Sequence, residues 1–231
     1  MKLAISLLLL LMPICVNAQN ATKEKHSHEH GDKPHGAGAK AVILEKKTVA
    51  ATAASPEFIQ LAKNVEIIPN IEDAIKSVGV LTHEGVFGPL LFAEQTRAFF
   101  IELKPGMFLS EHPHATGSII YTVRGKWVLA SEGKRHVMEA GSLFRFGDNM
   151  PTGWEAPFQE GAFLLVVKTK KKGEAYEPFL KGIKKMKADV EKQKAGGEPF
   201  YYNALKPDHP AIVFAKSVNP KFDEVLKNIK Y

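Results

Sequence analysis

The chain has 231 residues, of which 45% are hydrophobic and 24% are charged, so its composition is that of a globular protein with one domain or at most two small ones. Its 31 basic and 25 acidic side chains give a formal charge of +6, which favours an acidic partner without identifying it. The single cysteine, Cys15, excludes a disulfide scaffold and a zinc cluster held by thiolates.

The first 18 residues have the character of a secretory signal peptide. A short basic start is followed by an uncharged apolar run from Leu3 to Val16, and Val16-Asn17-Ala18 offers the small residues that a signal peptidase needs. The run is too short and wrongly flanked for a membrane span. We therefore expect an exported protein, periplasmic or secreted, without stable membrane insertion after cleavage, and export argues against a nucleic-acid partner. The alternative is a buried N-terminal helix.

Residues 19–54 are polar, rich in small residues and without a sustained apolar period, which predicts a disordered segment. Within it, four histidines stand in ten residues: His26, His28, His30 and His35. Such a tract cannot pack a core, but its imidazole nitrogens can bind transition metals. A metal-binding tail and a solvated linker with incidental histidines both remain open.

Residues 55–170 are expected to form a β-domain behind a short leading helix. Ser55 and Pro56 supply the N-cap and the first residue of that helix. Short β-rich segments then alternate with glycine, proline and asparagine, which is typical of an antiparallel sandwich or barrel. The predicted strands are residues 99–103, 118–123, 126–130, 135–138, 142–146 and 162–167.

Residues 171–231 are predicted to form a helical extension. An amphipathic helix opens at Glu177-Pro178 and ends at Gly196-Gly197, with an apolar stripe on one side and lysines over much of the rest. A second helix is expected to start at Asn219-Pro220. The lysines indicate a solvated helix face or, alternatively, a surface for an anionic polymer or lipid.

The segment that carries chemistry contains His112 and His114. Because side chains alternate along a strand, a His-x-His pair places both imidazoles on one face. Two adjacent imidazoles in a barrel form half of a first-row metal site. Alternation places Ser118, Ile120 and Thr122 on the same cavity wall, which predicts a pocket that is part apolar and part hydroxyl.

This segment resembles the first motif of the cupin superfamily, in which a glycine, a His-x-His pair, a glutamate and a second glycine follow in order. Gly106, His112, His114 and Gly125 match in place, whereas Ser118 stands where the family carries its ligand glutamate. Downstream, the residues that start at Ala140-Gly141 resemble the second cupin motif, in which a third histidine follows.

That third histidine is absent in either alignment. When the motif is aligned on Gly141, the position holds Thr152, and when it is aligned on Pro151-Thr152-Gly153, the position holds Ala156. Thr152 and Trp154 are assigned to the wall of the ligand pocket. Trp154 is either a stacking surface for a sugar or aromatic ligand or simply part of the core.

A further metal ligand would then come from elsewhere in the barrel. His136 shares strand parity with Met138, a predicted core position, and is the preferred third candidate after His112 and His114. The alternative for His136 is a structural or exposed histidine. Other side chains able to reach inward are His83, Glu94 and Glu102.

The resemblance covers roughly residues 80–170 and implies a mainly β fold, a single cupin or jelly-roll β-barrel with C-terminal α-helices packed outside. Cupins bind divalent Fe, Mn, Ni or Zn and include dioxygenases, lyases, isomerases and decarboxylases, as well as binding and sensory proteins. We therefore expect a small anionic or carbohydrate-like ligand and a weakly held divalent metal. The family also suggests a homodimer.

Three other interpretations stay open. Ser118 and Thr152 are consistent with a non-catalytic binding or sensing cupin whose metal site has decayed. The histidine-rich tail is consistent with a periplasmic metal-handling protein for Zn, Cu or Ni. A secreted barrel that serves an assembly and binds no small ligand is the last alternative.

Overall fold

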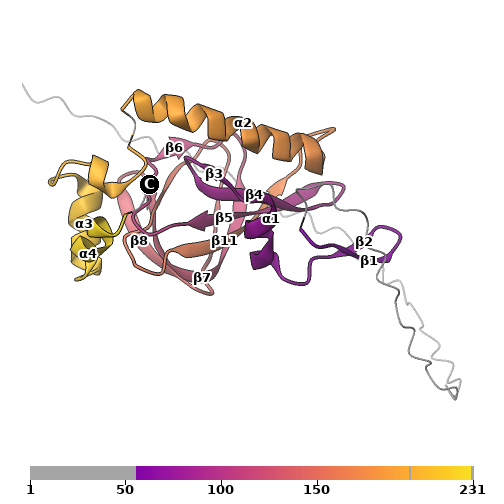
Figure 1. Cartoon of the computed structure of the whole chain (residues 1–231), viewed down its shortest axis with the longest axis horizontal. Coiled ribbons are helices and arrows are strands. Elements are labelled where there is room, and N and C mark those ends of the chain that lie inside the picture. Colours follow the sequence, from indigo (N-terminus) through magenta and orange to yellow (C-terminus); the bar gives the residue numbers. More distant parts are fainter. Residues whose placement is uncertain (1–55, 198, 230–231) are drawn as a thin grey trace, which may run out of the picture. The chain divides into compact units, whose positions relative to one another are not determined.

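The structure, a computed structural model, describes residues 56–197 and 199–229 (Figure 1). The signal peptide expected over residues 1–18 and the histidine-rich segment 19–54 lie outside this part of the chain. Among the described helices, none combines the length and the apolar character needed to cross a membrane.

A β-hairpin stands where the leading helix was expected. Strands β1 (Ile59–Ala62) and β2 (Val65–Ile67) pair antiparallel, with Ile59 opposite Ile67. Asn64 makes the turn between them with a positive φ of 61°, a conformation that asparagine tolerates better than most residues. The helix prediction is wrong because it relied on the cap-like Ser55 and Pro56, whereas the β-branched residues that follow favour extended backbone.

Nine antiparallel strands form the main sheet, which curls into the predicted cupin-type barrel (Figure 1). They are β3 (Val80–Thr82), β4 (Gly85–Phe92), β5 (Thr96–Leu103), β6 (His112–Pro113), β7 (Ser118–Ser131), β8 (Lys134–Glu139), β9 (Leu143–Phe146), β10 (Pro151–Glu155) and β11 (Ala162–Thr169). The hydrogen-bonded order is β3-β4-β5-β11-β7-β10-β6, and β8 and β9 also pair with β7. A short 3-10 turn (Ile71–Asp73) and α1 (Ala74–Val78) precede the sheet.

Strand β7 is one continuous strand where the sequence predicted two. Its first half pairs with β9 and β11, and its second half pairs with β8 and β10. Gly125 lies between the halves with a φ of +82°, opposite Ala162. A Cβ atom at Gly125 would collide with the carbonyl oxygen of Gly161, so only glycine lets the two backbones approach here.

The side chains inside the barrel follow the alternation expected of a strand. Ile120 and Thr122 are buried, whereas Ile119 and Tyr121, on the other face of β7, are exposed. Trp127 is fully buried and donates its indole N–H to the Thr122 hydroxyl at 3.0 Å. The barrel core is therefore apolar around one satisfied indole–hydroxyl pair.

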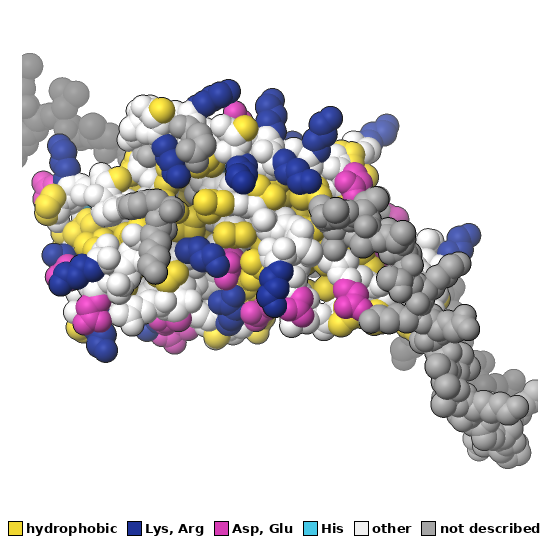
Figure 2. All heavy atoms as spheres, viewed as in Figure 1, with side chains coloured by type: hydrophobic (Ala, Val, Ile, Leu, Met, Phe, Trp, Pro, Cys, Tyr) yellow, Lys and Arg dark blue, Asp and Glu magenta, His cyan; other side chains and the backbone are white. Residues whose placement is uncertain are grey.

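Helix α2 (Tyr176–Ala195) lies along one side of the barrel, next to β3 and β4, as Figure 1 shows. Its buried stripe includes Leu180, Ile183 and Val190, in line with the sequence prediction. The opposite face is exposed and carries a row of basic side chains (Figure 2): Lys181, Lys184, Lys185, Lys187 and Lys192.

Two shorter helices follow, α3 (Pro210–Val218) and α4 (Phe222–Lys227). Helix α4 is the predicted second helix, and it buries Phe222 and Val225. Helix α3 was not predicted from the sequence. It starts at Pro210, with His209 as the N-cap accepting a hydrogen bond from the Ala211 N–H. Together these helices form a second apolar cluster around Phe108 and Tyr202.

The close approach of Gly125 to Gly161 gives a prediction about stability, and Gly133 provides the control for it. Gly133 also has a positive φ, but a Cβ atom there meets nothing within 4 Å. We expect Gly133→Ala to cost about 1 kcal/mol of unfolding free energy, for the left-handed backbone alone. Gly125→Ala should cost about 3 kcal/mol or more, because the backbone clash adds to it.

Urea unfolding followed by tryptophan fluorescence measures both variants. Equal losses of stability in Gly125→Ala and Gly133→Ala would contradict the role given to the close approach between β7 and Gly161.

Candidate functional site

His112 in strand β6 and His114, which directly follows that strand, lie side by side with ring centroids 4.5 Å apart. His112 lies opposite Thr152 of β10 in the sheet register. Both imidazoles are partly buried. The alternation of a strand therefore brings the two rings together on one side, as the His-x-His spacing predicts.

A carboxylate completes this pair, and it comes from Glu84 in the turn between β3 and β4. One ligand atom from each of Glu84, His112 and His114 lies within 4.8 Å of the other two. Among the described residues, this is the only group of three or more histidine, cysteine or acidic side chains close enough to hold one metal ion. Two imidazoles and one carboxylate form a donor set that suits Fe(II), Zn and related divalent ions.

Hydrogen bonds leave one nitrogen of each histidine free for a metal. Nδ1 of His112 lies 3.0 Å from the Ser110 carbonyl oxygen, so a proton on Nδ1 leaves Nε2 with a free lone pair. Nε2 of His114 is buried and has no hydrogen-bond partner in the described part of the chain. A buried nitrogen without a partner costs free energy, and a metal ion would satisfy it. The residues present therefore fit a divalent metal.

The protonation of His114 also suits metal binding. Burial lowers the pKa of His114 below its usual value, the nearby charge of Glu84 opposes that shift, and the charges of His112 and Lys168 add to it. A lowered pKa keeps the imidazole neutral at neutral pH, and the neutral form is the one that ligates metals.

The preferred third ligand from the sequence, His136, is not part of this group. It lies opposite Leu129 near the tip of the β7–β8 hairpin and is exposed, whereas Met138, two residues on, lies opposite Trp127 and is buried. Strand parity gives the face of a side chain but not its depth, so the prediction of His136 is wrong. Glu84 was missed because it lies in a turn, outside any strand alternation.

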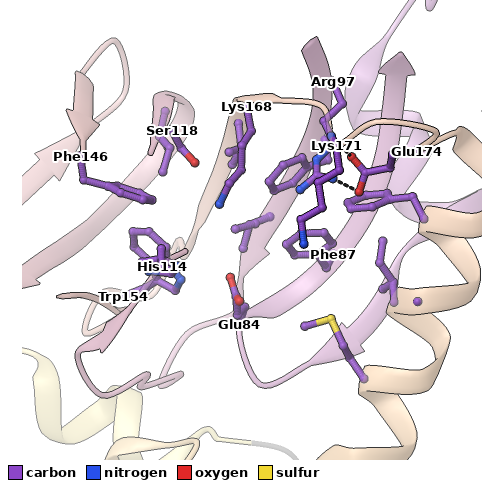
Figure 3. A pocket seen from close by; sticks show the side chains of 18 of the residues that line it. Glu84, Phe87, Arg97, His114, Ser118, Phe146, Trp154, Lys168, Lys171 and Glu174 are labelled. Atoms are coloured by element: carbon purple, nitrogen blue, oxygen red, sulfur yellow. Dashed lines mark hydrogen bonds and ion pairs between the residues drawn. The ribbon is translucent and has the colours of Figure 1, made fainter. Parts of the chain in front are cut away.

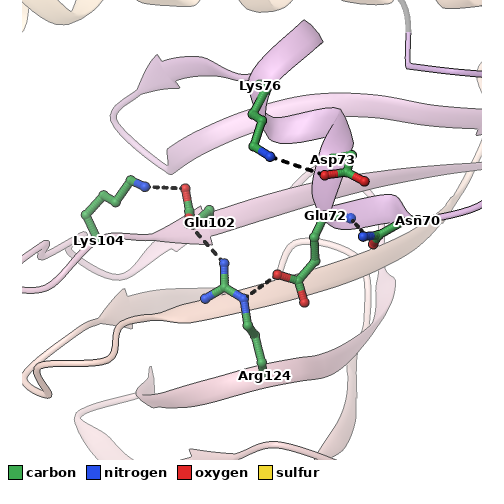
Figure 4. Close-up of polar contacts among 7 residues, drawn as sticks. All are labelled: Asn70, Glu72, Asp73, Lys76, Glu102, Lys104 and Arg124. Atoms are coloured by element: carbon green, nitrogen blue, oxygen red, sulfur yellow. Dashed lines mark hydrogen bonds and ion pairs between the residues drawn. The ribbon is translucent and has the colours of Figure 1, made fainter.

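Glu102, another side chain considered from the sequence, is engaged elsewhere. Its carboxylate accepts from the Arg124 guanidinium at 3.1 Å and pairs with Lys104, while Arg124 also binds Glu72 at 2.7 Å (Figure 4). These contacts tie the segment before α1 to the outer wall of the barrel. Glu102 is therefore a structural residue and not a metal ligand.

A cavity of about 440 Å³ lies between the barrel and α2 (Figure 3). His114 and Glu84 line it together with three of the predicted pocket residues, Ser118, Ile120 and Trp154. The other two predicted pocket residues do not line it. The Thr122 hydroxyl accepts a hydrogen bond from Trp127, and Thr152 is buried with its Oγ1 unpartnered among the described residues.

Helix α2 supplies the opposite wall of the cavity, which was not anticipated because the helix was expected to pack only outside the barrel. Five of its residues line the cavity: Pro178, Phe179, Gly182, Ile183 and Met186. Phe179 packs against Phe87 and Phe99, with ring centroids 6.0 and 5.7 Å away. Among the lining residues, Lys171, Pro178 and Gly182 are exposed, which locates the mouth of the cavity.

Three cationic side chains reach the cavity, and one of them is neutralised. Arg97 pairs with Glu174, and both side chains are largely buried. Lys168 and Lys171 form no ion pair with any described residue, and Figure 3 shows their amino groups directed into the cavity. Burial lowers the pKa of Lys168, and the neighbouring charge of Arg97 adds to this. An anion in the cavity would relieve both effects.

Comparisons with known proteins agree with this fold. Residues 103–210, slightly less than half of the chain, match the AraC-like ligand binding domain. No curated protein matches this sequence. This part of the chain is therefore similar to a ligand-binding domain of the cupin type, as the sequence motifs indicated.

Solved structures similar to the chain include three bacterial proteins. A Cupin 2 conserved barrel domain protein from Salinispora arenicola has 16% identity and a TM-score of 0.40, with 56% of this chain and 98% of that chain covered. An RmlC-like cupin from Shewanella frigidimarina has 19% identity and a TM-score of 0.37, with coverages of 41% and 84%. The polyketide cyclase RemF from Streptomyces resistomycificus has 18% identity and a TM-score of 0.37, with coverages of 40% and 70%.

Metal content is the direct measurement on this site. In a full-length background with the four tail histidines replaced by alanine, we expect about one divalent ion per chain after loading with Zn²⁺ and gel filtration. Glu84→Gln and His114→Ala should each lower the metal affinity tenfold or more, because the first removes the negative charge of the site and the second removes one of its three donors.

Ser118→Ala and His136→Ala are the matched controls and should keep the ion. Mass spectrometry of the eluted protein reads the metal content. A background protein without bound metal, or an equal loss in His136→Ala, would contradict the assignment of Glu84, His112 and His114.

Proposed function

We propose that this protein is an exported cupin that binds a small anion in the cavity between the barrel and α2, beside a divalent metal ion held by Glu84, His112 and His114. One observation carries the proposal: two of the three candidate metal ligands, Glu84 and His114, line the same cavity as the amino groups of Lys168 and Lys171. Export remains the expectation drawn from residues 1–18.

The metal would supply Lewis acidity to a bound carboxylate or carbonyl oxygen. With three protein ligands, such an ion keeps open positions that a bidentate ligand can occupy. The residues that would hold it are the turn carboxylate of Glu84 and the free nitrogens of His112 and His114. The Ser110 carbonyl keeps the His112 ring in its orientation.

The rest of the site binds and orients the anion. Lys168 stands at the end of β11, paired in register with Ser118 at the start of β7, so both side chains belong to one end of the cavity. The buried indole N–H of Trp154 has no partner among the described residues and is a further donor on this wall. The charge of the anion is thus met by Lys168, by hydrogen bonds and by the metal.

A non-catalytic binding or sensing role is the second candidate. The match to a ligand-binding domain favours it, because that description names binding and no reaction. An enzyme of the lyase, isomerase or dioxygenase type needs the metal for activity, whereas a sensor needs only the bound ligand. A tail-based role in metal handling concerns residues outside the described structure and is independent of both.

Binding of oxalate, a small dianion that chelates metals, tests the proposal. Trp154 lines the cavity, and its ring centroid lies 5.7 Å from that of Trp127. These are the only tryptophans of the chain, so intrinsic fluorescence reports on the site. We expect saturable binding to the metal-loaded full-length protein. Lys168→Met should weaken it about tenfold, or about 1.4 kcal/mol, because a half-buried counter-charge is lost.

Lys185→Met, on the exposed face of α2, is the charge-matched control and should bind oxalate like the wild type. The proposal fails if oxalate binds equally well to protein stripped of metal and to the Lys168→Met variant, or does not bind at all.

A further inference from the structure

Most polar groups of the cavity come from the barrel and from the loop between β11 and α2. Five side chains that can bind an anion or a metal line the barrel side and the β11–α2 loop: Glu84, His114, Ser118, Lys168 and Lys171. They come from the β3–β4 turn, from the residue that follows β6, from the start of β7, from β11 and from the loop after β11. Figure 3 shows these groups clustered around the same space.

The α2 side of the cavity has the opposite character. None of the five α2 residues that line it carries a side-chain hydrogen-bond donor or acceptor of ordinary strength: Pro178, Phe179, Gly182, Ile183 and Met186. Phe87 and Phe99 extend this apolar wall and stack on each other with centroids 4.7 Å apart.

One ion pair, between Arg97 and Glu174, lies next to this wall. Arg97 is bound to Glu174, and its guanidinium lies over the Phe179 ring at 4.6 Å from the centroid. Its face is therefore covered by an aromatic ring and one edge by a carboxylate, while its buried Nε has no hydrogen-bond partner among the described residues. Arg97 and Glu174 help to hold α2 against the barrel.

A polyol would bind weakly in such a cavity. A sugar acid carries hydroxyl groups on every side, and those that face Phe179, Ile183 and Met186 would be buried without hydrogen-bond partners. Each unsatisfied hydroxyl costs free energy, so a polar body loses affinity where an apolar one gains it. An apolar body instead removes its own surface and that of the three side chains from water.

We propose that the ligand is an amphipathic acid, with one anionic head and a flat or branched apolar body. This inference rests on the proposed function and names the class of anion that the same site selects. The head lies between Lys168 and the group formed by Glu84, His112 and His114. The body lies between Phe87 and Phe99 of the barrel and the apolar residues of α2, and the ligand enters past Lys171.

The test is calorimetric titration of the metal-loaded full-length protein with four probes. Phenylacetate has both head and apolar body, phenylacetamide has the body without the charge, acetate has the head without the body, and glucuronate has the head with a polar body. We expect phenylacetate to bind at least tenfold more tightly than each of the other three.

Two α2 variants connect this preference to the helix. Met186→Gln keeps the length of the side chain but makes the wall polar, so it should weaken phenylacetate at least threefold and leave acetate unchanged. Lys185→Gln, on the exposed face, should change neither affinity. The measured quantity is the ratio of the affinities for phenylacetate and acetate. A general loss of stability would lower both affinities and leave this ratio unchanged.

The inference is overturned if glucuronate binds as tightly as phenylacetate, if phenylacetamide does so, or if Met186→Gln leaves the ratio unchanged. If none of the four probes binds to protein that binds oxalate, this inference is overturned and the proposed function still stands. If oxalate fails as well, the proposed function falls with it.

Discussion

Strand β7 pairs with strands in both halves of the barrel, and the rest of the architecture depends on its backbone conformation at Gly125. Four strands pair with β7, two on either side of Gly125. Gly125 closely approaches Gly161 at the point where the pairing of β7 with β11 ends and its pairing with β8 begins. A single backbone conformation thus connects the wall that carries Ser118 and Ile120 to the core around Trp127.

The candidate site is assembled from the ends of strands that this arrangement brings together. Ser118 begins β7, Lys168 lies opposite it near the end of β11, and Glu84 lies in the β3–β4 turn. The barrel contributes most of the charged side chains and the candidate metal ligands, and α2 contributes apolar side chains. In the proposed function, metal binding and ligand selection therefore reside in different parts of the chain, and α2 would set specificity while the candidate metal ligands of the barrel stay the same.

Much of this was predictable from the sequence because it depends on local patterns. Alternation gave the inward-facing Ser118 and Ile120 and the pairing of His112 with His114, and the 3.6-residue period gave the buried stripe of α2. The failures have physical causes. Glu84 reaches the histidines through tertiary folding of a turn, and His136 is exposed because parity does not report distance from the core.

Because α2 is at once a surface helix and a wall of the cavity, ligand occupancy and the folding of this helix are thermodynamically linked. Any molecule that contacts α2 only when the helix is docked raises the free energy of undocking by RT ln(1 + [L]/Kd), about 2.7 kcal/mol at a hundredfold excess over Kd. The amide hydrogens of α2 would then exchange with solvent more slowly in the complex, while those of α3 and α4, which line no part of the cavity, would keep their rates.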